Sequence, residues 1–250
     1  MMFCNSIKRY LFPILLFAFF ISFADFVYFT VIRNFMMSIS SEVCVADFLE
    51  ESCAGNYMNL IVIPICSAFI TELSDFQKNT INYYYRMKSR KIIALRQFVR
   101  VLLLSITIST FWVLISSIIG GLFSSELINW NSRTSYSYLS KGLILDFNFF
   151  YIFELTFFKI LLPILFFSQL ECIINLVTKK VISFFIVVLL SGVNVFGYVK
   201  FYLGFICDNA INPSNYLSMT AAILLFIIFP LLITLSLYIF VKLFDRKDFI

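Results

Sequence analysis

Three ionisable side chains interrupt long apolar stretches of the sequence, and they are the first candidates for chemistry. They are Asp25, Glu154 and Lys159. A charge inside a membrane is costly, so such residues either line a substrate pathway or pair with other groups that hold helices together. Glu154 and Lys159 lie about 140° apart around a helix, which makes direct pairing imperfect. Asp25 is expected near the outer end of its stretch, within reach of water. Both roles stay open.

The sequence offers little else for catalysis. It contains no His, which removes the usual general base near neutral pH and the commonest metal ligand. The six Cys show no C-x-x-C spacing, so no metal or redox motif is indicated. Residues 192–197 have the spacing of a P-loop, but Tyr198 and Val199 replace its Lys and Ser/Thr. We therefore expect no catalytic, cofactor-binding or metal site in this chain.

Two of the cysteines, Cys44 and Cys53, fall in one short connection between predicted helices. A disulfide could form between them if that side of the membrane is oxidising. Two free or buried thiols are an equally good interpretation.

The composition indicates that lipid is the solvent of this protein. Of 250 residues, 61% are hydrophobic and 13% are charged, with a mean hydropathy of +0.95. A soluble domain has far more charge. The net charge of +5 comes from basic residues beside apolar stretches, which indicates membrane orientation rather than nucleic-acid binding. Few Gly and Pro residues are available for linkers, so we expect one domain over residues 1–250.

Six stretches are long enough to cross a bilayer, which takes about 20 apolar residues. The predicted spans are approximately residues 10–32, 54–75, 99–121, 148–170, 181–199 and 219–241. Most of the 19 Lys and Arg residues fall on one side if both termini are cytoplasmic. The prediction is thus an all-α, six-span integral membrane protein. The absence of N-glycosylation sequons and the many Phe, Ile, Asn and Lys residues favour a bacterial plasma membrane.

The connection between the second and third predicted spans has a distinctive pattern. Glu72 ends the second span, Asn79-Thr80 follows, and Ser89-Arg90 and Arg96 open the third span. This pattern resembles the membrane subunits of ABC-2 type transporters. In that family an acidic residue, a Gly-Thr or similar pair, a short helix, a Ser-Arg dipeptide and a basic residue occur in this order. Asn79 stands where Gly is usual, and Arg96 where Lys is commoner.

The resemblance implies a coupling helix, at roughly residues 76–88, that docks into a separate cytoplasmic ABC ATPase. Aromatic and Arg side chains are the groups that dominate protein interfaces. A basic loop lying on the membrane surface is the alternative interpretation. Under the resemblance, ATP and Mg would bind to the partner ATPase. The candidate coupling residues are Glu72, Phe76, Lys78, Tyr84, Tyr85, Arg86, Lys88, Ser89 and Arg90.

Two further patterns concern packing and charge. Ser105, Ser109, Ser116 and Gly120 form a ridge of small residues that permits close helix approach, either to a second permease copy or to a neighbouring helix of the same chain. The predicted outer loop, residues 33–56, carries four acidic residues, which could attract a cationic peptide or could simply be solvated. These are Glu42, Asp47, Glu50 and Glu51.

The function expected from these features is that of a permease subunit of an ATP-driven ABC exporter. Its partners would be the ATPase, a second identical or related permease, the lipid bilayer and a peptide, antimicrobial or amphipathic substrate. The alternative is a membrane interaction or immunity protein that sequesters a partner and transports nothing. An intramembrane enzyme has the least support, because no convincing carboxylate pair or Ser-Lys arrangement is present.

Overall fold

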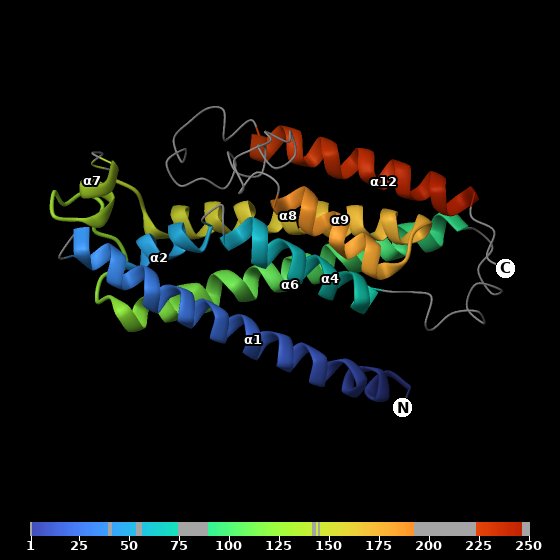
Figure 1. Ribbon diagram of the computed structural model, residues 1–250, viewed down its shortest axis with the longest axis horizontal. Coiled ribbons are helices and arrows are strands. Elements are labelled where there is room, and N and C mark those ends of the chain that lie inside the picture. Colours follow the sequence, from blue (N-terminus) through green and yellow to red (C-terminus); the bar gives the residue numbers. More distant parts are fainter. Residues whose placement is uncertain are drawn as a thin grey trace. The chain divides into compact units, whose positions relative to one another are not determined.

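A computed structural model describes residues 2–39, 42–53, 57–74, 90–141, 144, 146–192 and 224–246 (Figure 1). Within these ranges the regular elements are helices, and an isolated β-bridge joins Glu42 and Ser135. The elements are α1 (Met2–Ile39), α2 (Val45–Ser52), the π-helical turn η1 (Met58–Val62), α4 (Ile63–Ser74), α6 (Arg90–Phe123), α7 (Tyr136–Lys141), α8 (Phe149–Val177), α9 (Lys180–Gly192), the π-helical turn η5 (Leu224–Ile228) and α12 (Phe229–Arg246).

Among the residues that the structure describes, four helices are long and apolar enough to cross a membrane. They are Pro13–Ile39, Lys91–Phe123, Phe149–Val177 and Phe226–Leu243. Met58–Ser74 and Lys180–Gly192 are shorter apolar helical stretches. The prediction of a helical, multi-pass membrane protein is confirmed to this extent. The count of six spans and the cytoplasmic placement of both termini stay predictions.

Large apolar side chains cover the outer faces of these helices. Phe19 is 72% exposed, Leu122 70% and Phe150 77%. In water such a surface would drive association, because burial of apolar area is favourable. In a bilayer the same side chains contact lipid, which explains why these helices need no further protein cover.

Close contacts divide the chain into two compact units. Unit 1 comprises Met1–Ser52 and Thr110–Phe157, and unit 2 comprises Cys53–Ser109 and Phe158–Ile250. The helices α6 and α8 each contribute one part to each unit.

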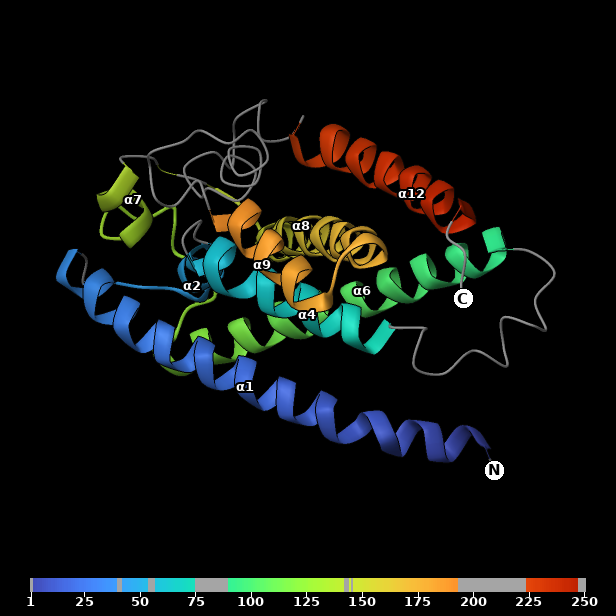
Figure 2. The ribbon, with the colours of Figure 1, turned by 45° about the vertical axis from the view of Figure 1, so that its right-hand side comes forward.

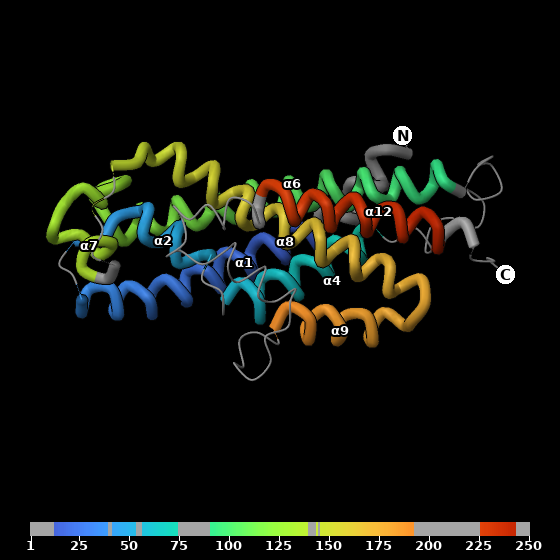
Figure 3. The backbone as a smooth tube through the Cα atoms, turned by 90° about the horizontal axis from the view of Figure 1, so that it is seen from above, coloured from blue at the N-terminus to red at the C-terminus, as the bar shows by residue number. Residues whose placement is uncertain are grey.

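Unit 1 is centred on a cluster of aromatic and aliphatic side chains from α1, α2, α6 and α7 and from the residue Val43 before α2. Figure 3 shows the backbone of these helices. The ring centroids of Phe29 and Phe48 are 5.2 Å apart. Gly120 allows α2 to approach α6 closely, since a Cβ atom there would lie 3.1 Å from the Cβ atom of Phe48. The Ser116 hydroxyl contacts α1, at Asp25. Ser116 and Gly120 belong to the predicted ridge of small residues. They pack against α1 and α2 of the same chain, respectively.

In unit 2, α9 runs antiparallel to η1 and α4, and Figure 2 shows α4 and α9 side by side. Two contacts define their register. Lys180 meets Glu72 at one end, and Gly192 meets Leu60 at the other, where a Cβ on Gly192 would be 2.8 Å from Leu60 Cδ2. From the first contact to the second, the chain advances along α9 by as many residues as it goes back along α4 and η1, as an uninterrupted antiparallel pairing requires.

Both π-helical turns end two residues before a proline, Pro64 after η1 and Pro230 after η5. Proline has no N–H group, and its ring clashes with the carbonyl four residues earlier in an α-helix. A wider turn relieves that clash. At η1 the Ile63 N–H donates to the Met58 carbonyl, a five-residue step.

Candidate functional site

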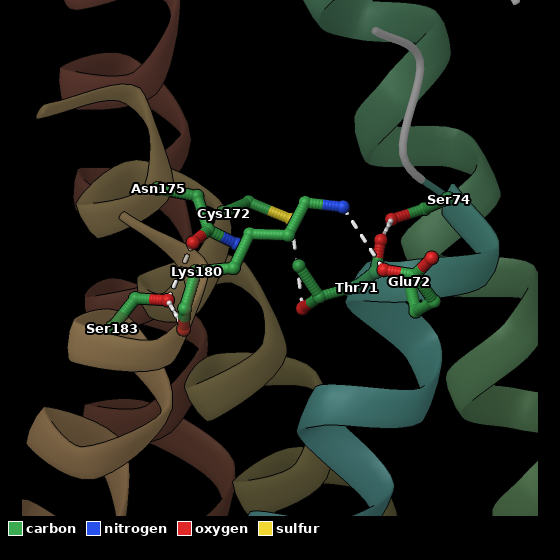
Figure 4. A network of polar contacts seen from close by, with 7 residues as sticks. All are labelled: Thr71, Glu72, Ser74, Cys172, Asn175, Lys180 and Ser183. Atoms are coloured by element: carbon green, nitrogen blue, oxygen red, sulfur yellow. Dashed lines mark hydrogen bonds and ion pairs between the residues drawn. The ribbon is translucent and has the colours of Figure 1, made fainter. Parts of the chain in front are cut away.

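An ion pair in unit 2 joins the last turn of α4 to the first residue of α9. Lys180 Nζ lies 2.9 Å from Glu72 Oε2, and their side chains are 45% and 51% exposed. Figure 4 shows the Lys180 side chain extended toward Glu72. Glu72 is the acidic residue that the sequence pattern singled out, but its partner was not expected, because Lys180 lies 108 positions away.

Buried and partly buried polar contacts continue from this pair into unit 2 (Figure 4). The Cys172 thiol of α8 donates to Thr71 Oγ1 of α4 at 4.0 Å. Gln97 Nε2 of α6 donates to the Cys172 sulfur at 3.8 Å. The Ser183 hydroxyl of α9 contacts Asn175 Oδ1 and the Lys180 carbonyl. Side chains from four helices thus meet at one end of unit 2.

Glu171, next to Cys172 on α8, is the buried acid of this region. Glu171 is only 3% exposed. The Ser67 and Thr71 hydroxyls lie beside its carboxylate, and Lys180 is its charged neighbour. Its Oε2 atom has no hydrogen-bond partner among the described residues.

Sequence reasoning missed Glu171 because the fourth span was predicted to end at residue 170. In the structure α8 continues to Val177. The available signal was the sequence Cys-Ile-Ile-Asn-Leu-Val after the acid, apolar except for Asn175, which extends the hydrophobic helix by almost two turns.

Most of the predicted coupling segment lies outside the described residues. This applies to Asn79-Thr80 and to the candidate residues Phe76, Lys78, Tyr84, Tyr85, Arg86, Lys88 and Ser89. The structure does describe its two boundaries: α4 ends at Ser74, two residues after Glu72, and α6 begins at Arg90. Arg96 lies exposed on α6.

The three ionisable residues of the predicted spans have different environments. Asp25 is fully buried, and the Ser116 hydroxyl donates to its Oδ2 at 2.9 Å. The expectation that water reaches Asp25 was wrong, because α6 covers this face of α1. Lys159 is 1% exposed, whereas Glu154 is exposed. Their five-residue offset places them on different faces of α8.

A second polar region, in unit 1, surrounds α2. Asp47 is fully buried in the first turn of that helix. Its Oδ1 accepts the Trp130 indole N–H at 2.7 Å, and its Oδ2 accepts the Cys44 backbone N–H at 2.8 Å. The second bond caps the start of the helix. Asp47 thereby joins α2 to the segment that follows α6.

The other acidic residues of the predicted outer loop are also held by protein groups. The Tyr136 hydroxyl donates to Glu51 Oε1 at 3.4 Å, and the Thr134 hydroxyl donates to Glu42. Glu50 is 1% exposed. Burial, followed by the negative charge of Glu51, raises the pKa of Tyr136. The expectation of a simply solvated acidic loop was wrong for Asp47 and Glu50, because α2 folds these two of its four carboxylates into unit 1. Attraction of a cationic peptide stays a prediction.

Cys44 and Cys53 are both buried in this structure. Burial raises the pKa of Cys44, and the neighbouring Asp47 charge acts in the same direction. The disulfide between the two residues stays a prediction.

Comparison with known proteins does not assign this chain to a family. No protein-family model, no curated protein and no solved structure matches the chain. Within the part of the chain that the structure describes, no group of three or more Cys, Asp or Glu residues could hold a metal ion. The functional argument therefore depends on the residues themselves.

Proposed function

We propose that this chain is the permease subunit of an ATP-driven ABC exporter in a bacterial plasma membrane, and that a separate ATPase docks on residues 76–88. Two such subunits, identical or related, would form the pathway for a peptide, antimicrobial or amphipathic substrate. Both termini would be cytoplasmic.

The observation that carries this proposal is the position of Glu72. It lies in α4, just before the segment that resembles a coupling helix, and it is paired with Lys180 at the start of α9. A movement of the segment would act on α4 directly and on α9 through this ion pair. The continuous antiparallel pairing of α4 with α9 would carry that movement along both helices.

Buried polar groups of unit 2 support a pathway role. Asn59, Ser168 and Gln169 are at most 1% exposed. Side-chain polar atoms of all three have no hydrogen-bond partner among the described residues. Such groups are costly in an apolar environment. A polar substrate passing through the membrane would satisfy them.

The test is affinity purification of the tagged chain from its native membrane, with identification of its partners and an ATPase assay on the complex. We expect an ATPase with Walker motifs to co-purify. A variant carrying Tyr84→Ala, Tyr85→Ala and Arg86→Ala should recover roughly tenfold less of it, since aromatic and Arg side chains dominate interfaces.

A matched control carries the same kinds of substitution elsewhere, Tyr138→Ala and Arg133→Ala, and should retain the ATPase. If the wild-type chain purifies without any ATPase, the exporter proposal fails. Recovery of a non-ATPase membrane protein in its place would favour the alternative, a non-transporting immunity or sequestering protein.

A further inference from the structure

The buried carboxylate of Glu171 forms no ion pair of its own among the described residues of unit 2. The charged groups near it are Lys180 at the start of α9 and, through Lys180, Glu72 at the end of α4. The Lys180 ammonium lies 2.9 Å from Glu72, so these two charges compensate each other. The negative charge of the Glu171 carboxylate is left without such compensation, in a residue that is only 3% exposed.

An isolated buried carboxylate is too costly to persist in a membrane protein without a counter-charge. Glu171 Oε2 has no hydrogen-bond partner among the described residues. A positive species at Oε2 would supply the missing counter-charge.

The groups around this oxygen are suited to a hard cation. The Ser67 and Thr71 hydroxyls lie beside the carboxylate. The Ser67 hydroxyl donates its hydrogen to the Pro64 carbonyl at 3.0 Å, which leaves its lone pairs available as ligands. Thr71 Oγ1 accepts from the Cys172 thiol and so presents an oxygen as well. Carboxylate and hydroxyl oxygens are ligands for hard metal ions.

The charge of the site favours a monovalent ion. One carboxylate neutralises one positive charge, whereas a divalent ion would leave an excess charge in an apolar environment. Calcium also takes six to eight oxygen ligands, roughly twice what Glu171, Ser67 and Thr71 supply.

We propose that Glu171, Ser67 and Thr71 bind a monovalent metal cation, with sodium as the probe, between α4 and α8. This site is separate from the predicted docking segment, and its existence does not depend on the proposed transport function.

The test is the thermal stability of the purified full-length chain in detergent at constant ionic strength, with sodium chloride replacing choline chloride. Wild-type protein should show a saturable rise in Tm, by roughly 3–6 °C at ten times the half-saturating concentration. Binding of radioactive sodium to the same preparation provides a measurement that does not depend on stability.

Three variants distinguish the site from a general salt effect. Glu171→Gln should abolish both the sodium-dependent shift and sodium binding. Ser67→Ala keeps the charge and should raise the half-saturating sodium concentration several-fold. Glu154→Gln makes the same chemical change at an exposed position of α8 and should behave as the wild type.

Equal Tm values in sodium and choline would overturn the proposal, as would an unchanged sodium response in Glu171→Gln. A wild-type Tm that depends on pH and not on sodium would overturn it too, because the neutralising species would then be a proton. If Glu171→Gln fails to fold, the affinity of Ser67→Ala for radioactive sodium is the deciding measurement. An affinity equal to that of the wild type would contradict the proposed site.

Discussion

The indole N–H of Trp130 donates to the buried carboxylate of Asp47 at 2.7 Å, across 83 positions of sequence. This bond fixes α2 against the segment that follows α6. Because Asp47 also accepts the Cys44 N–H, a single carboxylate both caps a helix and joins two distant segments of unit 1. Asp47, which the sequence places in a predicted loop, therefore holds two distant segments of unit 1 together.

Removal of the Trp130 donor should destabilise unit 1. Trp130→Phe keeps an aromatic ring but leaves Asp47 Oδ1 without its charge-assisted hydrogen bond, which costs about 2 kcal/mol. Denaturation of the purified protein, followed by near-ultraviolet circular dichroism, measures the change. Tyr151→Phe at an exposed aromatic position should change stability by less than about 0.5 kcal/mol. Equal effects of the two substitutions would contradict the role of this bond.

Two adjacent glycines of α6 provide a second prediction. A Cβ on Gly120 would lie 3.1 Å from Phe48 Cβ, whereas a Cβ on Gly121 would meet nothing within 4 Å. Gly120→Ala should destabilise the protein by about 1–3 kcal/mol, since the crowded atom is close to the α2 backbone. Gly121→Ala should be neutral or stabilising by up to about 1 kcal/mol, because Ala favours the helix. Thermal unfolding of the two variants in parallel gives the comparison, and a destabilising Gly121→Ala would refute it.

The Glu72 and Lys180 pair should contribute little to stability by itself. Both side chains are about half exposed, and exposed ion pairs contribute about 0.2–1 kcal/mol. A double-mutant cycle with Glu72→Gln and Lys180→Met should show coupling in this range. It should shrink when choline chloride raises the ionic strength. The same cycle with Lys179→Met should be additive, and coupling that persists at high ionic strength would indicate a buried pair instead.

Labelling with N-ethylmaleimide and peptide mapping can show whether Cys44 is a thiol or part of a disulfide. A raised pKa keeps the thiol protonated at pH 8, and the thiolate is the reactive species. Native protein should therefore leave Cys44 unlabelled at pH 8, whereas protein denatured without reductant should be labelled. If labelling of the denatured protein requires a reductant, Cys44 forms a disulfide, and the partner peptide will show whether it is Cys53.

The local sequence was sufficient to predict that this protein is helical. The long apolar stretches predict membrane helices because the hydrophobicity of about 20 consecutive residues is a property of the chain itself. Exact ends were harder to predict. The first helix continues to Ile39 and the fourth predicted span to Val177, since polar residues at a helix end do not stop the backbone hydrogen bonds.

The environment of each charge was decided by the tertiary structure. Asp25, Asp47 and Glu171 are buried, while Glu154 lies exposed on a helix of similar apolarity. Composition cannot separate these cases, because burial depends on which distant residues pack against a side chain. Ser116 covers Asp25 from 91 positions away, and Trp130 reaches Asp47 from 83. The sequence by itself therefore determined that this is a helical membrane protein, and only the packing of distant helices decided which of its acidic groups lie in the interior.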